Sequence, residues 1–248
     1  MPRSQNNSHP SVSSRRDFIR TSTLAASGLV AGGLSLGRSV HAAGSDVLKV
    51  GLIGCGGRGT GASGNALNAD PNTKLVAMGD AFSERIEGCL KGLKSYGDRV
   101  DVPPERRFVG FDAYKKVIES GVDVVVLAET PQFRPKHLKA AIDAGKHVFC
   151  EKPVAVDGPG IRSVLATCEE AKRKNLSIVS GLCWRYHNGV RETMKRVLDG
   201  EIGRILTIQE TYLTGLLWER PRQPQWTEME FQMRNWYYFT WLSGDHNV

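Results

Sequence analysis

Short, continuous apolar runs alternate with amphipathic stretches along most of this chain. The apolar runs cover residues 47–53, 74–79, 107–109, 122–127, 147–150 and 177–182. Continuous runs of this length are typical of parallel strands that are buried on both faces. The stretches between them carry apolar residues three and four positions apart, which predicts helices. The pattern therefore predicts an α/β protein with a doubly wound parallel sheet.

Local signals mark the ends of several predicted helices. Ser83 can cap a helix whose apolar residues share one face. Asp157 can open a later helix in which Ile161 and Leu165 belong to the apolar stripe. Further helices are predicted over 112–119 and 135–144, and from Asn188 onward.

The character of the sequence changes at residue 188. A strand-like stretch over 205–213 follows the helix that begins there, and residues 216–242 are rich in aromatic side chains without a clear period. Those aromatics favour either core packing or an insertion that faces a substrate or another subunit. We therefore predict a Rossmann domain over 43–187 and part of a second domain over 188–248.

A glycine-rich turn follows the first predicted strand. Gly54, Gly56 and Gly59 have the G-x-G-x-x-G spacing of a dinucleotide-binding fingerprint. The first glycine permits the sharp turn, the second permits close approach of a pyrophosphate, and the third permits close packing of the next helix. That helix directs unpaired N–H groups toward the phosphates, where we also expect Arg58. The predicted cofactor contacts here are Gly54, Cys55, Gly56, Gly57, Arg58 and Gly59.

The second strand ends in Asp80, about twenty residues after the fingerprint. A carboxylate at this position accepts hydrogen bonds from the adenosine ribose hydroxyls. Its charge would repel a 2′-phosphate, so the sequence predicts that NAD is preferred over NADP.

Three strand ends carry further candidate residues, because ligands of open α/β sheets bind beyond the carboxyl ends of the strands. Thr130 and Pro131 follow one strand, and Glu151 and Lys152 follow the next, so we expect these four residues to contact the cofactor. Lys152 can also reach a substrate hydroxyl and move a proton, which makes it the predicted catalytic residue. Arg185, Tyr186 and His187 follow the sixth strand as candidates for substrate contact, with a purely structural His187 as the alternative.

The N-terminal 42 residues resemble a twin-arginine export signal. Arg15 and Arg16 precede a weakly apolar, glycine-rich stretch that ends at Ala42 in a small-residue cleavage pattern. This predicts export to the periplasm or another extracytoplasmic space through the twin-arginine machinery. A disordered basic tail and an uncleaved membrane anchor are the alternatives.

Charge and cysteine usage exclude some functions. The signal-like segment holds five Lys or Arg and one Asp, so most of the net charge of +7 lies there. No basic stripe with interleaved aromatics remains, which argues against nucleic-acid binding. The five cysteines lack metal-ligand spacing, so we expect no metal site and interpret them as core thiols.

The motifs together resemble the glucose-fructose oxidoreductase and inositol dehydrogenase family, called Gfo/Idh/MocA. The resemblance rests on V-G-L-I-G-C-G-G-R-G, A-E-T-P and A-G-K-H-V-F-C-E-K-P-V-A, and it extends over 47–213. It implies a Rossmann domain, a second α/β domain with an open, largely antiparallel sheet, and NAD(P)-dependent redox chemistry on a sugar or polyol. It also implies that Lys152 is catalytic and that the full-length protein forms a homo-oligomer.

Two departures from the family pattern qualify these expectations. The family often has a histidine a few residues after the position of Thr130 and Pro131, whereas this chain has one only at His137. The family's D-x-x-x-H pair in the second domain is missing, since Asp245 and His246 are poor substitutes. We therefore expect an incomplete second domain and negligible turnover by this chain alone. The leading interpretation is an exported dehydrogenase. The alternatives are an NAD-dependent glycosidase of the same fold and a nucleotide-binding protein without turnover.

Overall fold

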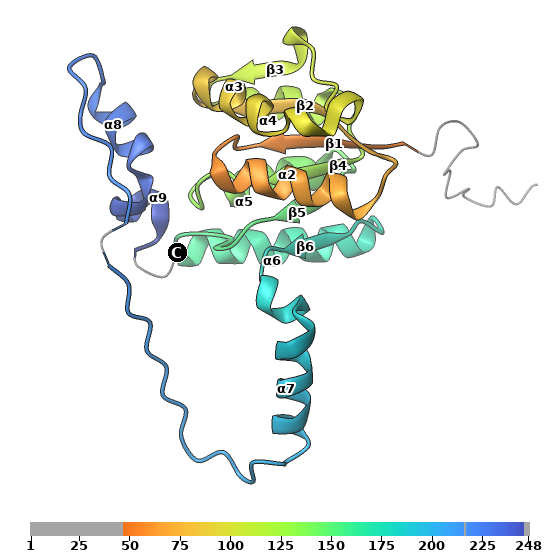
Figure 1. The fold of residues 1–248 in the computed structure, drawn as a ribbon, viewed down its shortest axis with the longest axis vertical. Coiled ribbons are helices and arrows are strands. Elements are labelled where there is room, and N and C mark those ends of the chain that lie inside the picture. The colour runs from red at the N-terminus through yellow and green to blue at the C-terminus, as the bar shows by residue number, and fades with distance from the viewer. Residues whose placement is uncertain (1–46, 216, 246–248) are drawn as a thin grey trace, which may run out of the picture. The chain divides into compact units, whose positions relative to one another are not determined.

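The computed structural model describes residues 47–215 and 217–245, which contain one six-stranded sheet with all strands parallel (Figure 1). Its order is β3-β2-β1-β4-β5-β6. Because the order reverses between β1 and β4, the carboxyl ends of these strands open a crevice. The predicted doubly wound sheet is confirmed. The strands are β1 (Leu48–Ile53), β2 (Thr73–Asp80), β3 (Arg107–Val109), β4 (Val124–Leu127), β5 (His147–Cys150) and β6 (Ile178–Ser180).

Helices cover both faces of the sheet. One buried cluster joins the sheet to α2 (Gly57–Ala69) and α3 (Ser83–Gly92). The other joins it to α4 (Ala113–Glu119), α5 (Arg134–Asp143) and α6 (Gly158–Arg173). Short 3₁₀ turns connect some of these elements: η1 (Lys94–Arg99), η2 (Pro104–Arg106) and η3 (Cys183–Tyr186).

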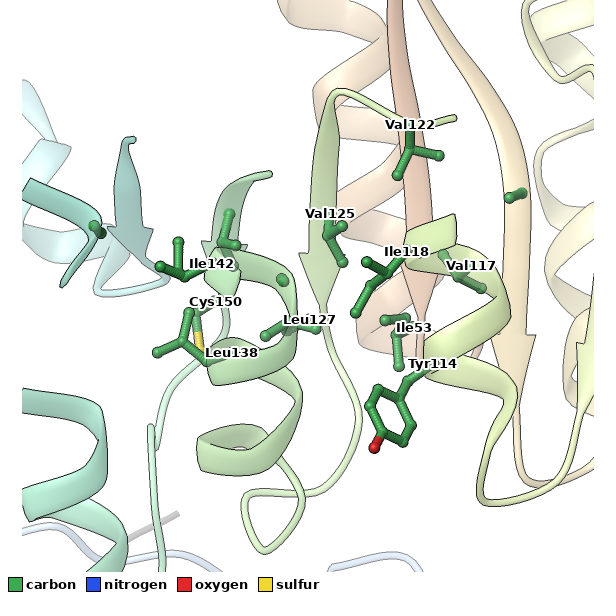
Figure 2. Close-up of a cluster of buried hydrophobic side chains, with 14 of the residues drawn as sticks. Ile53, Tyr114, Val117, Ile118, Val122, Val125, Leu127, Leu138, Ile142 and Cys150 are labelled. Carbon is green, nitrogen blue, oxygen red and sulfur yellow. The ribbon is translucent and has the colours of Figure 1, made fainter. Parts of the chain in front are cut away.

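Strand β4 shows why its sequence is continuously apolar. Val125 and Leu127 pack into the cluster that contains α4, α5 and α6, whereas Val126 packs into the cluster on the opposite face. Figure 2 shows Leu127 among side chains from α4 and α5, including Ile118 and Leu138. Each such side chain contributes about 1.5–3 kcal/mol when fully buried. Burial on both faces fixes β4 in the middle of the fold and its carboxyl end at the crevice.

Two local predictions about helices are corrected. Ser83 is the first residue of α3 rather than its cap; Phe82, which has an extended backbone, is the N-cap and provides no side-chain hydrogen bond. In α6, Asp157 does cap the helix, since its carboxylate accepts from the Gly160 amide at 2.7 Å. However, Ile161 and Leu165 are 42% and 61% exposed, because the face of α6 that packs into the core carries Val164 and Ala171 instead.

Beyond β6 the predicted second sheet is not seen in the described ranges. Residues 205–213 form no strand, and Leu206, Ile208 and Leu213 are exposed. A strand needs a neighbour to pair its backbone groups, and no described segment lies beside this one in a sheet. The elements here are α7 (Asn188–Leu198), α8 (Glu228–Arg234), η4 (Trp236–Tyr238) and α9 (Thr240–Ser243).

The predicted export signal, including Arg15 and Arg16, lies outside the described residues, as does His246. None of the helices within 47–215 and 217–245 has the length and apolar character needed to cross a bilayer.

Candidate functional site

The glycines of the fingerprint turn after β1 differ in the space that a side chain would have. Gly54 has φ +92°, and a Cβ there would lie 2.3 Å from the backbone nitrogen of Glu129. A Cβ on Gly59 would lie 1.8 Å from the carbonyl oxygen of Gly54, so α2 can approach β1 only without a side chain. By contrast, a Cβ on Gly56 or Gly57 would meet no protein atom within 4 Å. These two residues line a cavity, and the backbone there is open to a ligand.

The cavity lies at the carboxyl ends of the strands and has a volume of about 560 Å³. This is within the usual range of small-molecule and cofactor sites. It brings together most of the residues predicted from the sequence, whereas Cys55, Gly59 and Pro131 do not line it. Those that do are Gly54, Gly56, Gly57, Arg58, Asp80, Thr130, Glu151 and Lys152.

Asp80 is held at the cavity wall by the backbone. Its Oδ2 accepts from the Cys55 amide at 2.7 Å, and its Oδ1 accepts from the Phe82 amide at 2.9 Å. Burial raises the pKa of the Asp80 carboxyl, and these two amide donors oppose that rise. The carboxylate is therefore fixed in direction, and its oxygens retain lone pairs for hydroxyl donors.

The Glu151-Lys152-Pro153 segment is joined to the fingerprint by an ion pair. Arg58 Nε donates to Glu151 Oε1 at 2.6 Å, and Glu151 is buried whereas about half of the Arg58 side chain is exposed. Glu151 Oε2 accepts from the backbone amide of Lys152 at 3.2 Å. Lys152 is exposed and lines the cavity. The ion pair thus ties the segment that carries Lys152 to the start of α2.

A buried cluster beneath the site was missed by the sequence analysis. Arg134, at the start of α5, is only 4% exposed and donates to the carbonyl oxygens of Glu129 and Pro153. Burial lowers the pKa of Arg134, and the nearby Glu129 carboxylate opposes this. Arg134 therefore joins the loop after β4 to the loop after β5, which carry Thr130 and Lys152.

His137 belongs to the same cluster. Its Nδ1 lies 3.1 Å from Oε1 of Glu129, and its ring stacks on Tyr114 with 4.0 Å between centroids. The buried Oε2 of Glu129 and Oγ1 of Thr130 have no hydrogen-bond partner. His137 and Glu129 both line the cavity, so this histidine is near the site although its sequence position differs from the family pattern.

The three candidates for substrate contact, Arg185, Tyr186 and His187, do not line this cavity. Tyr186 and His187 line a second hollow together with Arg58 and Glu151, and Arg185 lines neither. His187 Nδ1 accepts from the Val190 amide at 3.3 Å and caps α7. Tyr186 is 60% exposed. Within the described residues these three do not join Lys152 in the cavity, and His187 has the structural role of a cap.

The cysteines also differ in part from the interpretation as core thiols. All five are unpaired; Cys55, Cys89 and Cys150 are buried, but Cys183 is exposed. Burial raises the pKa of the Cys150 thiol to about 12. The core interpretation is therefore wrong for Cys183, which follows the edge strand β6.

The aromatic residues near the C-terminus contribute to the cavity wall. Trp218, Trp236 and Tyr237 line it, and Trp218 packs against the Trp236 ring with 6.2 Å between centroids. Of the two alternatives left open by the sequence, a position facing the cavity applies to these three residues.

Comparisons with known proteins match this chain to one family and to several relatives. The family model GFO_IDH_MocA, described as an oxidoreductase family with an NAD-binding Rossmann fold, matches residues 48–179. An inositol 2-dehydrogenase from Acidiphilium cryptum is 28% identical over 165 residues, which are 66% of this chain and 45% of the relative. Glycosyl hydrolase family 109 protein 1 from Bacteroides fragilis is 29% identical over 178 residues, or 69% and 36% of the two chains.

A solved structure shares the fold. The myo-inositol 2-dehydrogenase from Lactobacillus plantarum is 27% identical, with a TM-score of 0.52 over 64% of this chain and 43% of that one. The matched region thus spans between about a third and a half of the length of these relatives.

Proposed function

This chain belongs to the GFO_IDH_MocA oxidoreductase family, and we propose that it transfers a hydride between a nicotinamide dinucleotide and a hydroxyl-bearing carbon of a sugar or polyol. The observation that carries the proposal is a single cavity whose wall includes Gly56, Asp80 and Lys152. These residues supply a place for phosphate, for ribose and for a reacting hydroxyl. The named inositol dehydrogenases among its relatives support a polyol as the substrate class.

The residues present fit a dinucleotide. Gly56 and Gly57 leave the backbone open where a pyrophosphate would approach, since a Cβ there would extend into free space. Asp80 is oriented by two backbone amides and can accept from ribose hydroxyls. Its negative charge favours NAD over NADP. When bound, the nicotinamide ring supplies the hydride acceptor or donor.

Lys152 is the group that handles the substrate proton. Oxidation of an alcohol removes a hydride with its electron pair from carbon and a proton from the oxygen of the same group. Lys152 lines the cavity on a segment anchored by Glu151 and by Arg134, and an amine there can take that proton and return it in the reverse direction. General acid–base catalysis of this kind contributes about 10²–10⁴-fold.

The test combines nucleotide titration with an assay of NADH formation on a panel of inositols and sugars. We expect NADH to bind more tightly than NADPH. In a form of the protein that turns over, we expect Lys152→Ala to lower kcat by about 100-fold or more, while the Kd for NADH changes less than about threefold. A matched control is Lys146→Ala, since Lys146 precedes β5 at the opposite end and is absent from the cavity wall. Unchanged kcat in Lys152→Ala would refute the assigned role.

A glycosidase is the second candidate function, and the similarity to the Bacteroides fragilis protein favours it. In such an enzyme the dinucleotide stays bound and the hydride returns to the sugar after elimination, so no net NADH accumulates. Cleavage of an aryl glycoside without net NADH would select this function. Stoichiometric NADH from a free polyol would select the dehydrogenase, and tight nucleotide binding with neither activity would leave a non-catalytic nucleotide-binding protein.

We further propose that the protein is exported by the twin-arginine pathway, on the basis of Arg15, Arg16 and the cleavage pattern ending at Ala42. The mature N-terminus is then expected at or near Ala43. N-terminal sequencing of secreted protein tests this, and efficient export after both arginines are changed to lysine would refute it.

A further inference from the structure

One wall of the cavity comes from outside the six-stranded sheet and its helices. Residues 217–245, here called the aromatic segment, supply Trp218 and Arg220 to this wall. Asp80 and Arg85, at the end of β2 and in the first turn of α3, also line the cavity. We propose that Arg220 binds a phosphate on the adenosine half of the dinucleotide, so that the aromatic segment completes the cofactor site. This rests on the proposed function.

The aromatic segment is fastened beside the adenosine end of the site. Arg234, in α8, lies over the Phe82 ring at 4.0 Å and over the Trp226 ring at 4.8 Å. Arg234 also forms ion pairs with Glu84 of α3 and with Glu230. A second attachment comes from the Gln132 amide, which donates to the Leu242 carbonyl at 3.3 Å. The segment is thus attached both to the start of α3 and to the loop after β4.

The backbone of Arg220 is held in place by a buried asparagine. The Arg220 amide donates to Oδ1 of Asn235 at 2.8 Å, and Nδ2 of Asn235 donates to the Arg220 carbonyl at 3.1 Å. Asn235 is 2% exposed, so these bonds are shielded from water. The Arg220 guanidinium lies over the Trp218 ring at 5.7 Å. Arg220 is therefore positioned by its neighbours at the cavity wall.

The charges here favour an anion. Neither Arg85 nor Arg220 forms an ion pair with a described carboxylate, whereas Arg234 is neutralised by two. Burial lowers the pKa of Arg220 most, the positive charges of Arg85 and Arg234 lower it further, and the negative charge of Glu84 raises it. Because Glu84 is already paired with Arg234, an anion that joins Arg85 and Arg220 still relieves the repulsion between these like charges. The adenosine half of a dinucleotide offers such an anion in its bridging pyrophosphate or, in NADP, in its 2′-phosphate.

Arg222, in the same aromatic segment, offers a matched control. Arg222 lies two residues from Arg220 and likewise stacks on an aromatic ring, with 5.1 Å from its guanidinium to the Phe231 centroid. It pairs with Glu228, however, and does not line the cavity. Arg222→Gln therefore removes the same kind of side chain from the same segment without touching the proposed contact.

The experiment measures the affinity of the full chain for NADH, NADPH, ADP-ribose and nicotinamide mononucleotide by calorimetry. Arg220→Gln is expected to raise the Kd for NADH and ADP-ribose about tenfold through loss of one charge-assisted hydrogen bond. It should leave nicotinamide mononucleotide within about twofold, and Arg220→Lys should recover part of the loss. Arg222→Gln should bind every probe like the wild type.

Comparison of NADH with NADPH distinguishes the two phosphates that Arg220 could contact. If Arg220→Gln loses the same affinity for NADH as for NADPH, Arg220 contacts the pyrophosphate. If it loses more affinity for NADPH, Arg220 contacts the 2′-phosphate. Both results support the inference. Wild-type affinity of Arg220→Gln for the dinucleotides and ADP-ribose would overturn it, as would an equal loss for nicotinamide mononucleotide. If the wild type itself binds no nucleotide, the proposed function fails instead.

Discussion

Replacing Arg134 by alanine removes the side chain that joins the loops after β4 and β5. Its guanidinium donates to the carbonyl oxygens of Glu129 and Pro153 in a place that is almost fully buried. In the variant both carbonyls lose their donor, and the buried Glu129 carboxylate loses a nearby positive charge. Each buried polar group left unpaired costs about 1–3 kcal/mol. The free energy of unfolding is therefore expected to fall by about 2–6 kcal/mol.

Such a loss is large beside the total of about 5–15 kcal/mol that is typical of domains. Urea denaturation followed by far-ultraviolet circular dichroism measures it, provided that the slope with urea concentration stays constant. Arg134→Lys keeps the charge but not the planar fork, so it should recover only part of the loss. Arg173→Ala is the control, because its pair with Glu170 lies on the surface of α6 and contributes less than about 1 kcal/mol.

A change of less than about 0.5 kcal/mol in Arg134→Ala would refute the reasoning, since water would then have replaced the guanidinium without cost. A second measurement separates positioning from stability. In a form of the protein that turns over, the folded Arg134→Ala variant should lose more in kcat than in affinity for NADH, because the loop that carries Lys152 loses its anchor. Equal losses of both would indicate general disorder of the site.

Three further predictions concern single positions. Gly56→Ala should keep the wild-type stability but weaken NADH binding at least tenfold, since its Cβ meets only the cavity. Gly59→Ala should instead destabilise the fold, because its Cβ overlaps a carbonyl oxygen. Thermal melts with and without NADH compare the two variants. Burial raises the pKa of Asp80, so NADH affinity should fall as the pH drops from 7 toward that raised value, and calorimetry on Asp80→Asn should find this slope absent. Cys183 should react with a maleimide within minutes at pH 8 while Cys150 stays protected until unfolding, as mass spectrometry of the labelled peptides can determine.

The sheet could be predicted because its signals are local. Strands buried on both faces need continuous apolar runs, and the turn at Gly54 needs glycine, so each element is visible within about ten residues of sequence. The helix cap at Asp157 is equally local. These features place the fingerprint glycines, Asp80 and Lys152 at one edge of the sheet.

The rest of the fold and of the candidate site depends on contacts between distant parts of the chain. Nothing near Arg134 indicates that it is buried, because its partners belong to two loops brought together only by the sheet. Arg234 meets Glu84 across 150 positions, so the position of the aromatic segment beside the cavity has no local signal. The strand predicted over 205–213 was wrong for the same reason, since pairing requires a partner that periodicity does not identify.

Under the proposed function, the ion pair between Arg58 and Glu151 would couple the two halves of the cavity. Arg58 donates to Glu151 through Nε, so a phosphate at the start of α2 would share the guanidinium with that carboxylate and would weaken the existing pair. A ligand that drew Arg58 away would release Glu151, the neighbour of Lys152. By thermodynamic reciprocity, a substrate that engages Glu151 frees Arg58 for phosphate to the same extent. Occupancy of the two halves of the cavity is in this way linked through one ion pair that spans 93 positions of sequence.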